Sequence, residues 1–397
     1  MGGGASKKKC NETCGPLPAR KPDVDMILLG APSVGKSTIF RQMKLLFRNG
    51  LTTKERTRLT FELRQNLLLS ILKLDEIGLT MGFFIEDEEV EEAITRLKMA
   101  VTDYDYDERD DENAVENQGL QNESVVDPNA ERLQELEFPS EDVMQVFKDP
   151  TIQKVYQHVI SGTFELDQSD SAGREIVQEA LPYVLRNIER IIDPEMIPSD
   201  DDCLHLRRMT TGVEKITYSV TLKNTGKYSS SLLCMCTDIG GQAQEQTKWE
   251  VHSKTADLIV FVASLADFDR ILPDGSNSFT MQLQLLNQVI CAPCFYHCNV
   301  IVLLNKQDIL IEKLKTKNLA DYIEDFGGST KVEDAVMYVQ EKCQIMLEQD
   351  AEKCTNGSRQ VQTVTTCALD SNMVENVLIG ALSAATCSAI SSFGLFG

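Results

Sequence analysis

The chain has 397 residues, 42% of them hydrophobic, and its 61 acidic and 39 basic side chains give a formal net charge of −22. This length suggests two domains rather than one, and the negative charge would repel nucleic acid, so a nucleic-acid-binding role is excluded. Because no apolar run approaches the ~18 residues that a membrane-spanning helix needs, we expect a soluble protein or one held to a membrane by other means.

The N-terminal tail is basic, in contrast to the rest of the chain. Gly2 followed by Ser6 fits the pattern for N-myristoylation, Lys7–Lys9 form a basic patch, and Cys10 is a candidate for palmitoylation. One acyl chain binds a bilayer only marginally, whereas a second chain or a basic patch makes the attachment stable. We therefore predict a lipid anchor; the alternative is a disordered tail with an unmodified Gly2.

A phosphate-binding loop is predicted between the first strand and the first long helix. Met26–Leu29 is a short apolar run that predicts a buried strand, and Lys36–Arg48 shows the apolar spacing of a helix. Between them, Gly30–Ser37 reads GAPSVGKS and matches the pattern G-x-x-x-x-G-K-[ST]. Successive backbone N–H groups, the Lys36 amine and the Ser37 hydroxyl at a helix N-terminus are groups that bind phosphate and Mg²⁺, so we predict a nucleotide site.

The next part of the chain is predicted to be helical. Helical periodicity runs from Leu59 to about Leu79 and continues through residues 86–198. The acidic stretch Asp103–Glu112 interrupts it and is interpreted as a solvated loop. The insert has roughly 140 residues, close to the size of an average domain.

After Pro198, strands and helices alternate. Lys215–Leu222 and Ser231–Cys236 predict a hairpin, and the apolar runs Leu258–Val262 and Val300–Leu304 predict buried parallel strands. The chain is therefore expected to be an α/β domain interrupted by an all-helical insert. The predicted segments are a tail at 1–23, an α/β domain at 24–50 and 204–397, and the insert with its linkers at 51–203.

Twelve cysteines are scattered along the chain without a repeating framework. In a chain of this length without an evident signal segment, this usage is typical of reduced thiols, and we expect no disulfide. The tightest cluster contains Cys291, Cys294, His297 and Cys298. Zinc ligation by this cluster is an alternative, but no second cysteine pair at finger spacing accompanies it.

A guanine-binding motif follows the last of these buried runs. Residues 305–308 read Asn-Lys-Gln-Asp and would lie at the carboxyl end of a strand, where α/β sheets bind ligands. Guanine offers two donors, N1–H and the 2-amino group, to one carboxylate, and adenine cannot make this contact. We therefore expect Asp308 to select guanine.

A second motif at a strand end carries groups suited to phosphate hydrolysis. Asp238 to Gln242 reads Asp-Ile-Gly-Gly-Gln and follows the strand Ser231–Cys236. Asp238 can hold Mg²⁺ through water, the glycines let a backbone N–H approach a γ-phosphate, and Gln242 can orient the attacking water. Taken alone, the same residues would be a Gly-Gly turn with an Asx cap.

These motifs together make the chain resemble the α-subunits of heterotrimeric G proteins from about residue 24 to the C-terminus. Small Arf-type GTPases share the Asp-x-Gly-Gly-Gln motif and the lipid signal, but in them only a short segment separates the residues that match Lys36 and Thr210. In this chain the predicted helical insert lies between these two residues, so the resemblance to the α-subunits is the better one. The remaining matching segments are Arg207–Gly212, Lys248–Trp249, Thr366–Ala368, and Phe164–Ala172 with Asp170 and Ser171.

The resemblance implies a Ras-like P-loop GTPase domain, with a mainly parallel sheet covered by helices on both faces, and an inserted all-helical domain. It implies a molecular switch that binds GTP and GDP with Mg²⁺ and hydrolyses GTP to GDP in receptor signalling. The implied partners are a βγ dimer, a seven-transmembrane receptor, RGS-type regulators and effectors. The implied location is the cytoplasmic face of the plasma membrane.

The resemblance also assigns roles to individual residues. Gln242 and Arg207 would be catalytic, the first positioning water and the second acting as a built-in arginine finger. Ser37 and Thr210 would ligate Mg²⁺, and Asp238 would support it through water. Arg207 has an alternative as a surface cation paired with the acidic run Asp200–Asp202. The nucleotide contacts would be Gly30, Ser33, Val34, Gly35, Lys36, Ser37, Thr38, Asp170, Ser171, Leu206, Arg207, Thr210, Gly241, Asn305, Lys306, Asp308, Cys367 and Ala368.

Several residues depart from the family pattern. Pro32, Ser33 and Val34 stand where the family usually has Gly, Glu and Ser. Pro32 lacks an N–H donor, and the missing acid removes a tie between the loop and the switch arginine. Ala243 and Gln246 replace arginines, and the proline-broken tail does not favour the N-terminal helix that docks on βγ.

Two other functions compete with the GTPase interpretation. One is a pseudo-GTPase that binds nucleotide without hydrolysing it and acts as a signalling scaffold, which the departures at Pro32 and in the switch allow. The other is an ATP-using P-loop kinase, which Asp308 and the absence of a basic lid segment disfavour.

Overall fold

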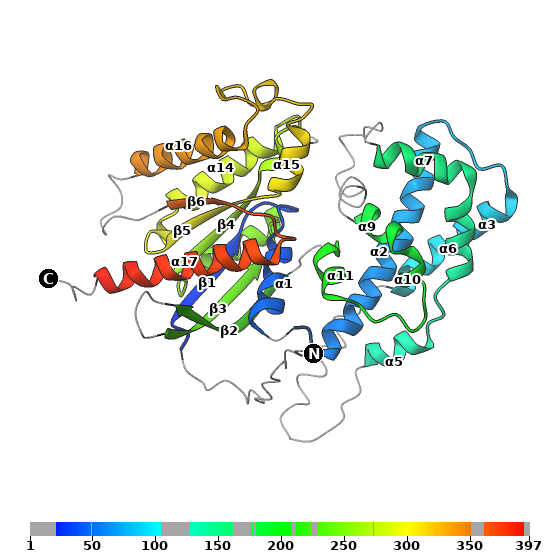
Figure 1. The fold of residues 1–397 in the computed structure, drawn as a ribbon, viewed down its shortest axis with the longest axis horizontal. Coiled ribbons are helices and arrows are strands. Elements are labelled where there is room, and N and C mark those ends of the chain that lie inside the picture. The colour runs from blue at the N-terminus through cyan, green and yellow to red at the C-terminus, as the bar shows by residue number, and fades with distance from the viewer. Residues whose placement is uncertain are drawn as a thin grey trace, which may run out of the picture.

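The computed structural model describes two groups of elements, a sheet covered by helices and a separate group of helices (Figure 1). Among the described residues, no helix is both long enough and apolar enough to cross a bilayer. The predicted tail with Gly2 and Cys10 lies outside them, as does most of the acidic stretch. The described residues are 21–48, 50–104, 128–161, 177, 180–207, 212–223, 229–272, 274–350 and 361–392.

The sheet has six described strands in the order β2-β3-β1-β4-β5-β6. The antiparallel pair β2–β3 confirms the predicted hairpin, and the pairings of β1 with β3, β1 with β4, β4 with β5, and β5 with β6 are parallel. All residues of β1 and β4 are buried, as expected for parallel strands covered on both faces. The strands are β1 Val24–Leu29, β2 Val213–Lys223, β3 Ser229–Ile239, β4 Leu258–Ser264, β5 Asn299–Asn305 and β6 Val361–Thr365.

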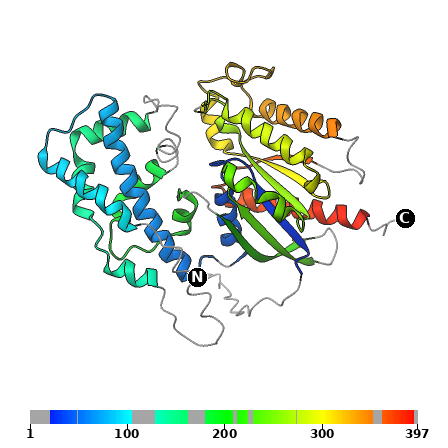
Figure 2. The ribbon, with the colours of Figure 1, turned by 180° about the vertical axis from the view of Figure 1, so that it is seen from behind.

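Helices cover both faces of the sheet, which is the predicted arrangement. The contacts of α1 with α17, β2 and β3 place this helix pair on one face, and those of α14 with α16 and β4 place the second pair on the other (Figures 1 and 2). The helices of this part are α1 Lys36–Phe47, α12 Ala243–Gln246, α13 Trp249–Ser253, α14 Ser278–Cys291, α15 Gln307–Lys313, α16 Val332–Asp350 and α17 Ser371–Ser392.

The helical insert is built around one long helix, α2, which begins at Thr53, six residues before the predicted start at Leu59. The Thr52 side chain accepts a hydrogen bond from the Glu55 N–H, and the Glu55 carboxylate accepts one from the Thr52 N–H, so a capping box fixes this end. The helices of the insert are α2 Thr53–Thr80, α3 Glu88–Ala100, α5 Pro128–Glu135, α6 Ser140–Lys148, α7 Pro150–Ile160, α9 Leu181–Arg186, α10 Ile188–Ile191 and α11 Asp200–His205.

The insert has a hydrophobic core of its own, separate from that of the sheet. Leu63, Leu67, Ile71 and Leu74 recur along α2 and are fully buried, as the helical periodicity requires. One prediction is wrong at its edge: the acidic stretch was expected to be a solvated loop from Asp103 onward. Asp103 and Tyr104 instead belong to a short 3₁₀ helix, Val101–Tyr104, because the Tyr104 ring is buried against Phe138 and Phe61.

Candidate functional site

The phosphate-loop motif lies between β1 and α1, at the carboxyl edge of the sheet. Gly30 has φ +143° and Gly35 has φ +99°, conformations that residues with a side chain rarely adopt. A Cβ on Gly30 would lie 2.2 Å from the Val262 carbonyl oxygen, and one on Gly35 would lie 2.1 Å from Nδ2 of Asn305. Both glycines are therefore required by backbone conformation and by space.

Lys36 points back into the loop that precedes it. It is 5% exposed, and its Nζ donates to the carbonyl oxygens of Gly30 and Ala31 at 3.0 and 2.7 Å. Burial lowers the pKa of the Lys36 amine to about 8, although the nearby Asp238 carboxylate favours the charged form. Gly241 packs against this group, since a Cβ there would lie 2.5 Å from Nζ of Lys36. The amine is thus held where the loop would enclose a phosphate.

Ser37 and Asp238 meet below the loop. The Ser37 hydroxyl donates to Oδ2 of Asp238 at 3.0 Å, and Asp238 is 1% exposed at the end of β3. Burial raises the pKa of Asp238 to about 6, against the influence of Lys36 and of the Ser37 hydrogen bond. Its other oxygen, Oδ1, is buried and accepts no hydrogen bond from the described residues. A hydroxyl beside a buried carboxylate with spare acceptor capacity fits the oxygen donors that Mg²⁺ prefers.

Asn305, at the end of β5, braces the phosphate loop through both ends of its side-chain amide. Its Nδ2 donates to the Val34 carbonyl at 2.8 Å, and its Oδ1 accepts from the Ala368 N–H at 2.9 Å. Gln42, fully buried on α1, donates to the Ala368 carbonyl at 3.0 Å. The side chain of Asn305 therefore joins the phosphate loop to the turn after β6. The sequence does not predict this role of Gln42, because a single polar residue on a helix carries no motif.

The residues that follow Asn305 in the chain form another part of the site. Lys306 has φ +61° and precedes α15, and Asp308 is exposed in the first turn of that helix. Burial raises the pKa of the Cys367 thiol, and the charge and hydrogen bonding of Asp308 raise it further. Asp308 thus has an accessible carboxylate next to the Cys367–Ala368 turn, the arrangement that a purine edge would need.

Arg207 reaches the phosphate loop from the two described residues that follow α11, Leu206 and Arg207. Its Nη2 donates to Oγ of Ser33 at 2.7 Å, so a neutral hydroxyl holds the guanidinium. The acidic run suggested as an alternative partner has other contacts: Asp202 pairs with Arg190 at 2.5 Å and Asp200 with Arg56 at 3.3 Å. The geometry places the Arg207 guanidinium at the loop.

Gln242 and its neighbours complete this edge. Gln242 is exposed at the N-terminus of α12. Gln246 donates from Nε2 to the Gly241 carbonyl at 3.0 Å. Trp249 is 5% exposed on α13, and its indole N–H donates to the Gly240 carbonyl at 3.4 Å. These two hydrogen bonds connect side chains of α12 and α13 to the backbone carbonyls of Gly240 and Gly241, directly after β3.

Some predicted site residues cannot be compared with the structure. Thr210, Asp170 and Ser171 lie outside the described residues. Within the described parts of the chain, no group of three or more His, Cys, Asp or Glu side chains is placed to hold a metal ion. In the cysteine cluster, Cys298 donates to the Ala256 carbonyl and Cys291 to the Asn287 side chain.

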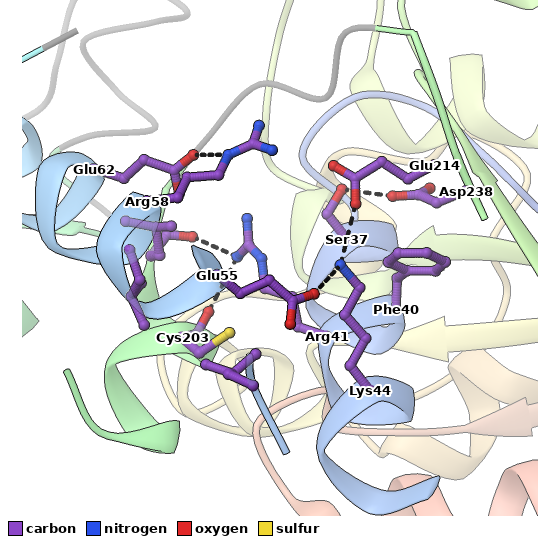
Figure 3. Close-up of a pocket in the computed structure, with 13 residues that line it drawn as sticks. Ser37, Phe40, Arg41, Lys44, Glu55, Arg58, Glu62, Cys203, Glu214 and Asp238 are labelled. Carbon is purple, nitrogen blue, oxygen red and sulfur yellow. Dashed lines mark hydrogen bonds and ion pairs between the residues drawn. The ribbon is translucent and has the colours of Figure 1, made fainter. Parts of the chain in front are cut away.

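A pocket opens beside the Ser37–Asp238 pair, at the seam between α1, α2, β2 and α11 (Figure 3). Charged side chains from both sides of the seam line it. Lys44 on α1 pairs with Glu55 on α2 at 3.1 Å and with Glu214 on β2 at 3.4 Å. The lining residues are Ser37, Phe40, Arg41, Lys44, Leu51, Glu55, Arg58, Leu59, Glu62, Cys203, Leu206, Glu214 and Asp238.

Comparisons with known proteins find a family that matches most of the chain. A family model described as G-protein alpha subunit matches residues 6–383. The alpha-17 subunit of the guanine nucleotide-binding proteins of Caenorhabditis elegans is 24% identical over 366 residues, which cover 89% of each chain.

Two further relatives give the same result. The alpha-16 subunit of Caenorhabditis elegans is 26% identical over 368 residues, covering 89% of this chain and 85% of the relative. The alpha-2 subunit of Caenorhabditis briggsae is 24% identical over 380 residues, covering 94% and 91%. The likeness thus spans both the sheet and the helical insert, at low identity.

Proposed function

The chain belongs to the G-protein alpha-subunit family, with a Ras-like domain and a helical domain, and is a guanine-nucleotide-binding signalling protein; from this premise we propose that it hydrolyses GTP to GDP with Mg²⁺. The observation that carries the proposal is the braced phosphate loop. Asn305 links this loop, which holds the buried Lys36 amine, to the turn beside the accessible Asp308 carboxylate. One rigid edge thus offers groups for both ends of a guanine nucleotide.

In the proposed mechanism, the phosphate loop and Lys36 hold the phosphates. Phosphate oxygens would replace the Gly30 and Ala31 carbonyls as acceptors for the amine, and burial makes that contact stronger than it would be in water. Ser37, with Asp238 and Thr210, would hold Mg²⁺. When bound, the ion would neutralise the charge that develops on the phosphate oxygens.

The proposed catalytic groups are Arg207 and Gln242. Arg207 already lies at the loop through Ser33, from where its guanidinium can stabilise charge on the transferred phosphoryl group. Gln242 is exposed beside the loop and would orient the attacking water, while the Gly241 N–H would donate to the γ-phosphate. Phosphoryl transfer needs such positioning more than covalent chemistry, so these groups suffice for slow turnover.

A pseudo-GTPase that only binds nucleotide is the second candidate. It is favoured by the contact between Arg207 and Ser33, because a neutral hydroxyl holds an arginine less strongly than a carboxylate does. The accessible Pro32 beside it further removes one N–H from the loop.

Nucleotide competition and single-turnover hydrolysis with purified protein test both candidates. GTP and GDP should compete with labelled GTP and ATP should not, and Asp308→Asn should weaken guanine binding. The parent should hydrolyse GTP, whereas Arg207→Cys and Gln242→Leu should bind GTP and hydrolyse it far more slowly. Equal competition by ATP would refute guanine selection; guanine binding without hydrolysis by the parent would favour the pseudo-GTPase.

We extend the proposal to the membrane and to signalling partners. The acidic body gives no basis for binding anionic lipid, so Gly2 acylation, with the tail lysines and Cys10, would hold the protein at the cytoplasmic face of the plasma membrane. There it would meet a receptor, a βγ dimer, RGS-type regulators and effectors. If Gly2→Ala leaves the protein in the membrane fraction of cells, the anchor is not Gly2 acylation.

A further inference from the structure

The end of α11 and the linker that follows it, residues 206–207, are held by hydrogen bonds from two helices on opposite sides of the seam. From α1, Nη1 of Arg41 donates to the carbonyl oxygens of Cys203 and Leu206 at 3.2 and 2.9 Å. From α2, Nδ2 of Asn66 donates to the carbonyl oxygen of Arg207 itself at 2.9 Å. Figure 3 shows Arg41 extending from α1 to Cys203 on α11. The helical insert therefore contacts the backbone of the proposed catalytic arginine.

The contact made by Asn66 is specific. Asn66 is 4% exposed, and Nδ2 donates to the Glu62 carbonyl, one turn back on α2, at 2.7 Å, as well as to the Arg207 carbonyl. Both partners are acceptors only, so the group facing them must be the amide NH₂, whose two hydrogens are both used. A side chain without an N–H donor in this place would remove the hydrogen bond that α2 makes to the Arg207 carbonyl.

Arg207 is consequently fixed at both ends. Asn66 holds its carbonyl oxygen, Arg41 holds the residue before it, and the guanidinium rests on the Ser33 hydroxyl. Because Ser33 offers a neutral hydrogen bond where the family usually offers an ion pair, the backbone contacts carry a larger share of the positioning. The same seam is held by the Lys44–Glu55 ion pair, so α1 and α2 keep a defined separation.

We propose that Asn66 and Arg41 are positioning residues for Arg207, through which the helical insert helps set the rate of GTP hydrolysis. This inference rests on the proposed function, in which Arg207 is catalytic. Catalysis of phosphoryl transfer depends on placing charge at the transferred group, and a displacement on the order of 1 Å can reduce a rate about 100-fold. Neither residue needs to contact the nucleotide to have this effect.

The test is a double-mutant cycle read by single-turnover GTP hydrolysis. Asn66→Ala should slow hydrolysis roughly 10- to 100-fold while GTP affinity is retained. Combined with Arg207→Cys, it should cause no further loss, because the side chain that it positions is already gone. Thr60→Val is the matched control: Thr60 is buried on the same helix and donates to the Arg56 carbonyl one turn back. It should hydrolyse GTP like the parent.

Arg41 tests the other half independently and serves if Asn66→Ala does not fold. Arg41→Lys keeps a donor within reach of the two carbonyls and should retain most of the rate, whereas Arg41→Met keeps the length of the side chain and should lose it. The loss in Arg41→Met should again disappear in the Arg207→Cys background. Rescue by lysine separates hydrogen bonding to the linker from simple packing on α1.

Two outcomes would overturn the inference. Either Asn66→Ala hydrolyses GTP like the parent, or its loss multiplies with that of Arg207→Cys, which would mean that Asn66 acts elsewhere. If the parent binds GTP but does not hydrolyse it, the proposed catalysis fails, and the rate of tryptic cleavage after Arg207 decides about the positioning. Faster cleavage in Asn66→Ala than in Thr60→Val would support the positioning of the linker; equal rates would refute it.

Discussion

At the carboxyl edge of the sheet, positive-φ glycines and hydrogen bonds to backbone carbonyls determine the structure, whereas in the helical insert apolar side chains packed around α2 determine it. Gly35 and Gly82 make the difference concrete. Both have positive φ, +99° and +75°. At Gly35 a Cβ would meet the Asn305 amide at 2.1 Å, while at Gly82 no atom lies within 4 Å of that position. The same backbone conformation is thus closely packed at the sheet edge and open in the insert.

This difference indicates what each region contributes. At the sheet edge, polar side chains are hydrogen-bonded to the backbone of neighbouring loops. Asn305 connects two loops, and the Lys36 amine donates to the carbonyls of the loop that precedes it. The insert needs only a hydrophobic core and capped helices, a requirement that many sequences meet. Its contact with the site passes through the seam, where α2 and α11 approach α1 and the phosphate loop.

The largest effect that separates the two regions should come from alanine at these glycines. Gly35→Ala places a Cβ in an unfavourable conformation and against Asn305, so we expect a loss of about 2–5 kcal/mol in stability and loss of GDP binding. Gly82→Ala meets the strain alone and should lose about 1–2 kcal/mol with GDP binding intact. Thermal unfolding measures the stability of the two variants, and a binding assay measures their affinity for GDP. Normal GDP binding by Gly35→Ala would show that the close packing at the sheet edge is dispensable.

The same contrast explains what could be predicted from the sequence. The phosphate loop, the hairpin and the buried strands β4 and β5 follow from motifs and apolar runs, since a loop that binds phosphate tolerates few residues. The sequence does not predict strand β6, because Val361–Thr365 is short and reads VQTVT, with neither an apolar run nor a regular alternation of polar and apolar residues. The brace role of Asn305 required the fold, since its partners are the backbones of Val34 and Ala368, far away in the sequence.

The contacts across the seam were beyond the reach of sequence analysis for a similar reason. Asn66 and Arg41 bind backbone carbonyls, and every residue carries a carbonyl, so the linker gives no sign of which one is used. Polar residues on helices are usually solvated, and periodicity alone offers no reason to single these out. A motif reveals a group that acts through its own side chain more readily than one that holds another group in place.

A smaller effect should come from a buried polar contact of the insert. Asp202 is fully buried and accepts hydrogen bonds from Arg190, Ser199 and Tyr183. Burial alone would raise the pKa of Asp202, but the hydrogen bonds of Arg190 and Ser199 outweigh it and hold the pKa below its usual value. A carboxyl with a lowered pKa in the folded state stabilises the protein above the pKa of the unfolded chain, and this stabilisation is lost as pH falls through the folded value.

We therefore expect Asp202→Asn to lose about 2 kcal/mol at pH 7, with a smaller difference from the parent as pH falls below about 4. Urea unfolding at several pH values measures this difference. Asp142→Asn is the control, because Asp142 pairs with the half-exposed Arg96 and should contribute at most about 1 kcal/mol. A difference between parent and Asp202→Asn that grows on acidification would contradict the assigned ionisation. GDP affinity should change far less than in Gly35→Ala.

The smallest expected effect is a change in tryptophan emission, which tests whether the segment after β3 moves when nucleotide binds. Trp249 is the only tryptophan in the chain, and its buried indole donates to the Gly240 carbonyl. The next residue, Gly241, packs against Lys36 and is proposed to donate its N–H to a γ-phosphate. A shift of this backbone towards the phosphate would change the hydrogen bond and the packing of the indole, and hence its emission.

Adding a non-hydrolysable GTP analogue to the GDP-bound protein should therefore change the Trp249 emission, and GTP itself should give a change that decays at the rate of hydrolysis. Trp249→Phe should remove the signal and serves as the blank. Because Gln246 holds the Gly241 carbonyl where the family has an arginine, the segment is tied to its own backbone and the change should be small. If filter retention shows that the analogue binds while the emission stays constant, the segment after β3 does not respond to the γ-phosphate. The rigidity of the phosphate loop would then extend to the switch itself, and a nucleotide-binding scaffold would explain the protein better than a GTPase.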